Sequence, residues 1–392
     1  MTTRRREEAE EDGTTTTTTT EDGADGRRCG RRMTIRVCEF YCGVGVMHAA
    51  LTRCARTPGR AFDVVGAFDI NPNACDAYEK NWGARPSQKS LVSVPMKTLE
   101  KLEADAWVMS PPCQPFTRQG LKKDVDDGRA ESFMRLVDEM AKMDPARRPK
   151  YVFVENVVGF ETSKMREILV QALSEMAFHT QEFILTPSMF GVPYSRPRYF
   201  MCARSTQPFA DAVDAIRRSP PRGELSHKRE WIPGYEETRD ADVDVAPLSR
   251  FMDPDDDDDD DTSLWDAHAV KQEDVNRAMG TIDIVTAQDV TCNCFTKSYF
   301  KYVKGTGSVV ANRPVDKSTW DGQMRAEDKD GVRLRYFTVK EVTRLHSLPD
   351  DFAWPDNLTL RQRYTLLGNS MSVACVAPLF DYLFSSASVE KL

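Results

Sequence analysis

Alternating apolar segments of two lengths dominate residues 34–204 and restrict the fold more than any other feature of the chain. Short runs rich in Val, Ile and Phe are typical of strands buried in a sheet, and longer amphipathic segments are typical of helices. The expected strands are Ile35–Phe40, Phe62–Phe68, Ala106–Met109, Tyr151–Val154, Phe183–Leu185 and Tyr199–Ala203. The expected helices span 46–55, 72–81, 130–143 and 163–177. This alternation predicts an α/β fold with a parallel, doubly wound sheet.

The other segments differ from this one in composition and divide the 392 residues into four parts. Residues 1–32 combine Arg, acidic residues and a run of seven threonines, which cannot bury a core, so we expect a disordered tail. Residues 33–204 form the predicted sheet domain. Residues 205–335 are rich in Pro, Asp and Arg, which predicts a smaller irregular domain with a disordered acidic loop near 238–263. Residues 336–392 regain helical periodicity and are expected to return to the first domain.

Charge and cysteine usage leave a nucleic-acid partner open and argue against zinc. The net charge is −8, but Asp253 and Asp255–Asp261 alone supply eight negative charges, and the rest of the chain is balanced. The ten cysteines include no Cys-x-x-Cys pair, so no metal site is expected. Their scatter suits a reducing compartment. With no apolar run of membrane-spanning length and no secretory signal, we expect a cytoplasmic protein, with the nucleus as the alternative.

A proline-mounted thiol follows the third expected strand. Pro111 and Pro112 fix two φ angles and remove two backbone donors immediately before Cys113. Such a mount holds a thiol at a set angle for attack on a carbon atom, which a nucleophilic catalyst requires. The simpler alternative is a Pro-rich turn around a buried free cysteine.

The turn after the first strand is typical of a cofactor site. Gly43 and Gly45 lie where the strand passes into a helix, and Asp69 ends the next strand. A strand, Gly-x-Gly, helix, strand and acid in this order indicate a nucleoside-bearing cofactor, whose ribose hydroxyls the acid binds. His48 stands where a phosphate-binding turn has its third glycine, which favours an adenosyl group over a dinucleotide. A tight turn that only packs the helix on the sheet is the alternative.

Four further segments carry candidate chemistry, each with an ordinary structural explanation. Glu155 follows a strand at the ligand side of such a sheet, where a carboxylate can hold and polarise a pyrimidine. Arg196 and Arg198 lie two residues apart in an extended segment, so both are expected on one face, which suits phosphates or a base edge. Cys294 is explained on chemistry alone by a buried thiol in a turn. Ser370 is expected to cap a last helix over 371–384.

Taken in order, these segments resemble the cytosine-5 methyltransferases of nucleic acids. The matching motifs are Phe40-x-x-Gly43-x-Gly45, Pro111-Pro112-Cys113-Gln114, Glu155-Asn156-Val157, Arg196-x-Arg198 and Gly368-Asn369-Ser370. The resemblance covers most of residues 34–385. Within these motifs the sequence is similar to the branch that methylates transfer RNA, above all in Cys294-Phe295-Thr296, Tyr299 and Gly305-Thr306-Gly307-Ser308.

The resemblance implies a Rossmann-like class I methyltransferase sheet with a smaller target-recognition domain, acting as a monomer with S-adenosylmethionine as cofactor. It implies that the substrate is an anticodon-loop cytosine of aspartate tRNA. By resemblance, Cys113 adds to carbon 6 of the base, Glu155 binds its ring nitrogen 3, and Arg196 and Arg198 position it. The residues implied in substrate recognition are Cys294, Phe295 and Thr296. The residues implied in cofactor binding are Phe40, Tyr41, Gly43, Val44, Gly45, Val46, Asp69, Ile70, Leu91, Val92, Ser110, Asn369 and Ser370.

Three positions depart from the family pattern, and two other functions stay open. Val46 replaces a usual glycine, Val92 replaces a common acidic residue, and Tyr194 replaces the Gln usual in DNA enzymes. The first alternative is a DNA cytosine-5 methyltransferase, favoured by the framework motifs and opposed by the Cys-Phe-Thr segment. The second is a catalytically silent nucleic-acid-binding protein, opposed by the intact set of Cys113, Glu155 and Arg196.

Overall fold

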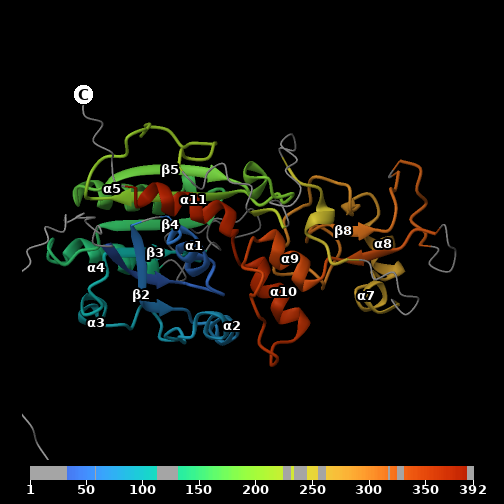
Figure 1. Cartoon of the computed structure of the whole chain (residues 1–392), viewed down its shortest axis with the longest axis horizontal. Helices are drawn as coiled ribbons and strands as arrows, with labels where there is room; N and C mark the ends of the chain where they lie inside the picture. Colours follow the sequence, from blue (N-terminus) through green and yellow to red (C-terminus); the bar gives the residue numbers. More distant parts are fainter. Residues whose placement is uncertain are drawn as a thin grey trace, which may run out of the picture.

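A six-stranded sheet forms the centre of the larger part of the molecule in the computed structural model (Figure 1). The structure describes residues 33–57, 59–112, 131–223, 231–233, 245–254, 262–316, 318–324 and 331–385. The strands are β1 (Met33–Phe40), β2 (Arg60–Phe68), β3 (Ala106–Met109), β4 (Tyr151–Val157), β5 (His179–Leu185) and β6 (Arg198–Arg204). Their order across the sheet is β2-β1-β3-β4-β6-β5. Each expected strand lies within one of these six, because short apolar runs bounded by polar turns mark buried strands well.

The expectation of an all-parallel sheet is wrong for one strand. β2, β1, β3 and β4 pair in parallel, whereas β6 lies between β4 and β5 and runs antiparallel to both. A parallel return from β5 would need the chain to cross back over the sheet, usually through an α-helix. The connection after Leu185 holds only the 3₁₀ turn Pro187–Phe190 and an extended segment, so the chain turns back beside β5.

Helices cover both faces of the sheet. α1 (Val46–Cys54) and α11 (Val373–Leu383) share one buried cluster, in which α11 lies along the sheet (Figure 1). α4 (Glu131–Lys142) and α5 (Lys164–Glu175) supply the second cluster, on the opposite face. α2 (Pro72–Trp82) and α3 (Met96–Glu100) connect β2 to β3. The predicted helices agree with α1, α2, α4 and α5 within two residues at each end, and the doubly wound α/β architecture is confirmed.

The elements between 262 and 336 belong to the predicted target-recognition domain and are called the recognition part below. They lie beyond α9 (Val339–Leu345) and α10 (Leu360–Gly368), at the far end of the molecule from the sheet (Figure 1). Its elements are short: α7 (Thr262–Ala267), α8 (Gln272–Ala278), β7 (Ile284–Val285), β8 (Val309–Ala311) and β9 (Leu334–Tyr336). Strands of two or three residues leave almost no periodic signal. The predicted tail, 1–32, lies outside the described residues, as do 238–244 and 255–261 of the predicted acidic loop. The prediction of disorder is wrong for 245–254, where Leu248–Arg250 form a 3₁₀ turn and Leu248 and Phe251 are buried. The domain boundaries stay predictions.

The C-terminal helices begin at clear sequence signals. Thr338 caps α9 and Thr359 caps α10, each in a reciprocal capping box with the residue three positions later. The prediction that Gly368-Asn369-Ser370 begins the last helix is wrong, because the amide of Asn369 still donates to the Thr365 carbonyl and the segment ends α10.

No single described helix is long and apolar enough to cross a membrane. The pair α10 and α11, bent by 40°, meets that length and composition only when the two are taken together. α11 is buried along its whole length.

Candidate active site

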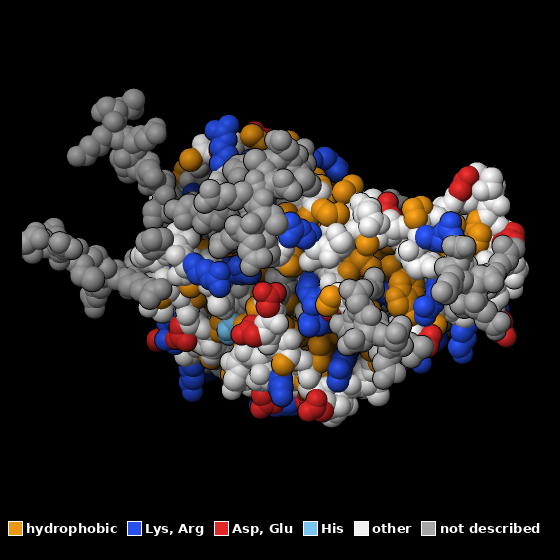
Figure 2. Space-filling view, turned by 45° about the vertical axis from the view of Figure 1, so that its right-hand side comes forward, with side chains coloured by type: hydrophobic (Ala, Val, Ile, Leu, Met, Phe, Trp, Pro, Cys, Tyr) orange, Lys and Arg blue, Asp and Glu red, His pale blue; other side chains and the backbone are white. Residues whose placement is uncertain are grey.

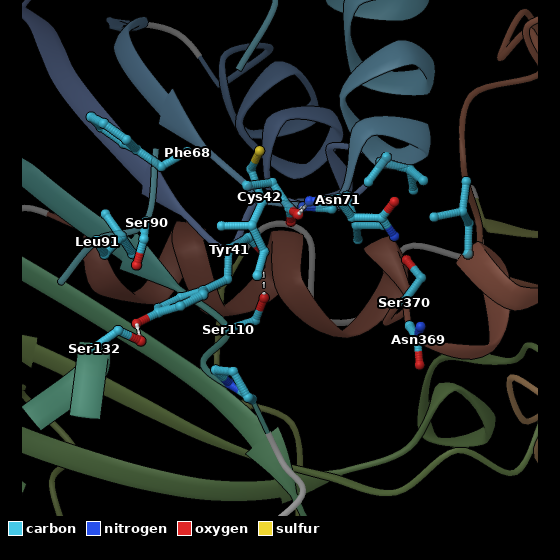
Figure 3. Close-up of a pocket in the computed structure, with 18 of the residues that line it drawn as sticks. Tyr41, Cys42, Phe68, Asn71, Ser90, Leu91, Ser110, Ser132, Asn369 and Ser370 are labelled. Carbon is cyan, nitrogen blue, oxygen red and sulfur yellow. Dashed lines mark hydrogen bonds between the residues drawn. The ribbon is translucent and has the colours of Figure 1, made fainter. Parts of the chain in front are cut away.

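A cavity of about 440 Å³ opens where β1, β2 and β3 end, and the segment between α10 and α11 forms its other wall (Figure 3). All the predicted cofactor residues except Phe40 and Gly45 line it. The lining residues are Tyr41, Cys42, Gly43, Val44, Val46, Phe68, Asp69, Ile70, Asn71, Ala74, Lys89, Ser90, Leu91, Val92, Ser110, Pro112, Ser132, Leu366, Asn369, Ser370 and Met371. The cavity therefore lies at the carboxyl ends of parallel strands, where open α/β sheets bind ligands.

Phe40 and Gly45 do not line the cavity but pack behind the residues that do. Phe40 is fully buried, stacks on Phe68 at 5.5 Å and meets Trp107 edge-on at 5.0 Å. Gly45 has φ +87°, and a Cβ there would overlap the indole of Trp82. That indole donates through Nε1 to the Val44 carbonyl at 3.1 Å. Glycine at such a turn is expected to let a ligand approach the backbone closely. The structure shows instead that Gly45 makes room for the indole of Trp82.

Asp69 fixes the shape of the turn. Its Oδ2 accepts the amide of Gly43 and its Oδ1 accepts the amide of Asn71, both at 2.8 Å. Burial raises the pKa of Asp69, and the two N–H groups offset part of that rise. Each carboxylate oxygen has two lone pairs, so both keep capacity for a ligand hydroxyl on the cavity side. Asp69 is therefore suited to orient the turn and to bind a ribose at once.

The walls of the cavity combine apolar surface with polar groups, as an adenosyl group requires. Ile70 is 71% exposed and Val92 is 38% exposed, which is unusual for large apolar side chains, and both line the cavity. Sequence reasoning missed Lys89, Ser90 and Ser132. Lys89 and Ser90 directly precede the predicted Leu91 and could have been found by adjacency, whereas nothing near Ser132 in the sequence marks it.

Tyr41 ties three elements together at the cavity (Figure 3). Its hydroxyl and the Ser132 hydroxyl at the start of α4 are hydrogen-bonded at 2.8 Å, and the Ser110 hydroxyl donates to its carbonyl at 2.8 Å. Burial raises the pKa of Tyr41 to about 12, so the phenol stays protonated. The ends of β1 and β3 and the beginning of α4 are thus held in one arrangement.

The chain approaches the predicted nucleophile along the rim of this cavity. Pro112 lines the cavity, and the Asn156 side-chain amide donates to the Pro111 carbonyl at 3.4 Å. The amide of Ser110 donates to the Phe40 carbonyl at 3.3 Å. Cys113 itself lies outside the described residues. Ser110 is therefore bonded to β1 and Pro111 to β4, just before Cys113, and the mounted thiol itself stays a prediction.

Glu155 lies in β4 as a buried carboxyl group beside an arginine. Arg198 Nε lies 3.3 Å from Glu155 Oε1, and both side chains are at most 15% exposed. Burial raises the pKa of Glu155, while the charges of Arg198 and then Arg196 limit the rise. A carboxyl group with a raised pKa stays protonated nearer to neutral pH, which suits a proton donor.

Arg196 is committed to partners inside the protein. It is 2% exposed, and its Nη1 donates to the Tyr194 hydroxyl at 3.2 Å, to Cys294 Sγ at 3.1 Å and to the Phe295 carbonyl at 2.9 Å. Its Nη2 donates to the carbonyls of Gly368 and Ser370. Both arginines do face one region, since both interact with Cys294 and Glu155. However, the contacts of Arg196 join protein segments and leave its predicted contact with the base to Arg198.

Cys294 differs from the neighbouring Cys292 in the direction of its pKa shift, since burial raises the pKa of Cys292. The charges of Arg196 and Arg198 lower the pKa of its thiol despite the opposing effect of burial. Cys294 and Thr296 line a second cavity of about 270 Å³. Phe295 points elsewhere and anchors the turn, with its ring 5.3 Å from Tyr194 and 4.8 Å from Tyr299. The predicted recognition segment is therefore divided between a cavity wall and a buried anchor.

Metal ligands do not gather anywhere in the described part of the chain. Its residues hold no group of three or more His, Cys, Asp or Glu side chains that could bind an ion. The eight cysteines within those ranges are free thiols.

Comparison with known proteins yields one family and a consistent set of relatives. Residues 35–385 match the family described as C-5 cytosine-specific DNA methylase. A protein from Dictyostelium discoideum named DNA (cytosine-5)-methyltransferase is 35% identical, with 90% of this chain and 94% of that protein aligned. The tRNA (cytosine(38)-C(5))-methyltransferase of Homo sapiens is 31% identical, over 89% and 99% respectively.

Solved structures agree with the sequence relatives. The crystal structure of S. pombe Dnmt2 methyltransferase has a TM-score of 0.73 and 28% identity, with 90% of this chain and 98% of that chain covered. A mutant of Spodoptera frugiperda DNMT2 has a TM-score of 0.71 and 30% identity, with 90% and 100% covered.

Proposed function

The chain belongs to the family of C-5 cytosine-specific DNA methylases, and we propose that within this family it methylates transfer RNA. The proposed substrate is cytosine 38 in the anticodon loop of aspartate tRNA. Relatives named tRNA (cytosine(38)-C(5))-methyltransferase support this choice of nucleic acid. The Cys-Phe-Thr segment and the motifs around it support the same branch. We place the reaction in the cytoplasm, with the nucleus as the alternative, and in a monomer.

One observation carries the proposal: the run-in to Cys113 and the cofactor residues border the same cavity. Pro112 lines the cavity together with Asp69, Ile70 and Ser370. The thiol that follows Pro112 in the chain is thereby tethered where a methyl donor would be bound. A binding protein has no need for this combination, which argues against the catalytically silent alternative.

S-adenosylmethionine is the methyl donor of this family, and it supplies an electrophilic methyl group. The residues of the cavity fit its parts. Asp69 would accept the ribose hydroxyls, and the exposed side chains of Ile70 and Val92 would flank the adenine ring. Ser110, Ser370 and Asn369 would bind the polar amino-acid end from the opposite walls.

Within this proposal the chain's own groups make the cytosine reactive. The Cys113 thiolate forms a bond to carbon 6, while Glu155 donates its proton to ring nitrogen 3 and leaves carbon 5 nucleophilic. After carbon 5 has accepted the methyl group, a water molecule takes its proton, and the electron pair of that C–H bond expels the Cys113 thiolate from carbon 6. The proton on nitrogen 3 returns to Glu155. Arg198 lies beside Glu155 and would hold the base or its phosphate.

A single-stranded loop suits this chemistry. The target base must leave its stack to reach a thiol, and unstacking costs less in a loop than in a duplex. Figure 2 shows Lys and Arg side chains along the middle of one face, where they would attract a nucleic-acid backbone.

A DNA cytosine-5 methyltransferase is the second candidate. The observation that favours it is the Dictyostelium relative, which is 35% identical and carries DNA in its name. The two candidates differ in substrate and share the residues and the chemistry above.

Transfer of labelled methyl groups to total tRNA and, separately, to unmethylated duplex DNA tests the proposal. We expect label on wild-type tRNA, none on aspartate tRNA with uridine at position 38, and none with Cys113→Ala. Cys75→Ser is the matched control, because the hydroxyl can still donate to the Asp69 carbonyl, and it should retain transfer. Label on DNA alone would establish the second candidate, and transfer by Cys113→Ala would exclude the covalent route.

A further inference from the structure

The second cavity is separate from the cofactor cavity and has no role in the reaction as described so far. It measures about 270 Å³ and is lined by Thr281, Asp283, Asn293, Cys294, Thr296, Gly305 and Gly307. This is slightly below the roughly 300–1,000 Å³ of cavities that enclose drug-sized ligands. The volume suits one or two fused rings rather than a whole nucleotide.

The chemistry of the lining favours an uncharged, hydrogen-bonding ligand. No Lys or Arg is among the described residues that line it, and the Asp283 carboxylate would repel a phosphate. The side chain of Asn293 is exposed, and its carboxamide has no hydrogen-bond partner in the described part of the chain, so both its donor and its acceptor are available. The backbone amide of Asn293 donates to the Ser308 hydroxyl at 2.7 Å. The Thr296 hydroxyl accepts the amide of Ser298 and keeps its own proton to donate. Such a set matches the polar edge of a nucleobase.

The rim of the cavity has the opposite character. Residues 297–304 join two lining residues, Thr296 and Gly305, and the Thr296 amide closes this loop on the Thr306 carbonyl at 2.8 Å. Lys297, Lys301 and Lys304 are all exposed on the loop. Tyr302 is 52% exposed there, with Lys301 Nζ 4.7 Å from its ring centre. Cations on the loop beside a hollow with no Lys or Arg among its described lining residues suit a nucleotide whose base enters while its phosphate stays outside.

A short chain of contacts joins this cavity to the proposed reaction centre. Cys294 on its wall interacts with both Arg196 and Arg198, and Arg198 Nε lies 3.3 Å from Glu155. A base in the cavity would therefore lie one layer of side chains from the base held by Glu155. We propose that this cavity binds the unstacked nucleobase adjacent to the target cytosine, an inference that rests on the proposed RNA substrate.

Paired changes in protein and RNA test the proposal. The probe is an anticodon stem-loop that contains the target cytosine, either intact or with an abasic nucleotide immediately 5′ or 3′ of it. With the wild-type protein, the abasic change on one side should lower kcat/KM at least about fivefold, the usual effect of losing one base-edge contact. Asn293→Ala should cause a similar loss on the intact loop. The two losses should not multiply, because both remove the same contact.

Control variants separate this contact from general damage. Asn276→Ala removes an exposed amide of the recognition part that does not line the cavity, and it should leave kcat/KM unchanged. Gly305→Asn should fill the cavity, since a Cβ at Gly305 meets nothing within 4 Å and Asn tolerates its φ of +67°. It should weaken binding of the intact loop and spare binding of the abasic one.

The outcomes distinguish this inference from the function on which it rests. If the wild-type protein methylates the loop but the losses from Asn293→Ala and the abasic change multiply, the cavity is not a base site. The same conclusion follows if neither abasic change has an effect. If the wild-type protein methylates no RNA, the proposed function is wrong and the base site is excluded with it.

Discussion

At the scale of single residues, Arg198 alters the proton affinity of two neighbours, Glu155 and Cys294. The Arg198 charge limits the rise in the pKa of Glu155 that burial causes, and with Arg196 it lowers the pKa of Cys294. The arrangement holds an acid whose pKa is raised and a thiol whose pKa is lowered within one region. Perturbed groups of both kinds in contact are typical of functional sites.

Replacing Arg198 with Gln should shift the pH dependence of methyl transfer. Loss of the positive charge raises the pKa of Glu155 further, and protonated Glu155 is the form that donates to the base. Activity that falls as pH rises through this pKa should therefore persist to higher pH, although the maximal rate falls at least about tenfold. The pH profile of kcat/KM measures this. Arg198→Lys keeps the charge and should keep the profile; a shift to lower pH in Arg198→Gln would contradict the assignment.

Cys294 should be the first of the described cysteines to react with iodoacetamide near neutral pH. Its pKa is lowered and it is half-buried, whereas the other described cysteines are buried. Peptide mass spectrometry after brief alkylation measures the order of labelling. Arg198→Gln should slow the labelling because the thiol pKa rises. Equal rates for Cys294 and the buried Cys292 would refute this reading of the site.

At the scale of elements, the sequence predicts what depends on local pattern and misses what depends on distant partners. The apolar runs locate all six strands of the large sheet, and the capping residues mark helix starts. The antiparallel direction of β6 was missed, and it follows from a connection that holds a 3₁₀ turn and no crossover helix. Arg196 was expected to face the substrate, but its acceptors at Gly368 and Ser370 lie more than 170 positions away. Ser132 reaches the cavity only because α4 begins there.

The two capping boxes should differ in their contribution to stability. Thr359 is exposed, so Thr359→Ala should cost about 1 kcal/mol of unfolding free energy. Thr338 is buried, and its hydroxyl also donates to Asp253 Oδ2 at 2.7 Å. Thr338→Ala removes both bonds and should cost about 2 kcal/mol or more. Urea unfolding at unchanged m-value measures both, and an equal cost would mean that the Asp253 bond contributes nothing.

At the scale of the whole molecule, one buried junction joins the sheet, the recognition part and the cofactor wall. Arg196 lies two residues before β6 and donates to the carbonyls of Phe295 and Ser370, which joins all three. A Cβ at Gly368 would overlap the backbone of Thr296, so the end of α10 and the recognition turn are in direct contact. Burial lowers the pKa of the adjoining His346 to about 3, which keeps the junction free of a second positive charge.

Arg196→Lys should weaken this junction and, through it, cofactor binding. A lysine has three donors at one point and cannot satisfy acceptors on three separate segments. We expect a loss of about 2 kcal/mol or more in unfolding free energy and a higher Kd for S-adenosylmethionine, because Ser370 lines the cofactor cavity. Calorimetric titration measures the Kd. Arg344→Lys, which disturbs a bond to Asp253 away from the cavity, should lower stability alone. Unchanged cofactor affinity in Arg196→Lys would show that the junction does not shape the cavity.

The contact between Gly45 and Trp82 also limits how such sequences can diverge. Any side chain at position 45 collides with the indole, and a smaller residue at 82 gives up its bond to Val44 and leaves a void. Each change lowers stability while the other residue is unchanged, so the two positions depend on each other. A lineage can leave this pairing only through a less stable intermediate, and neither position drifts independently.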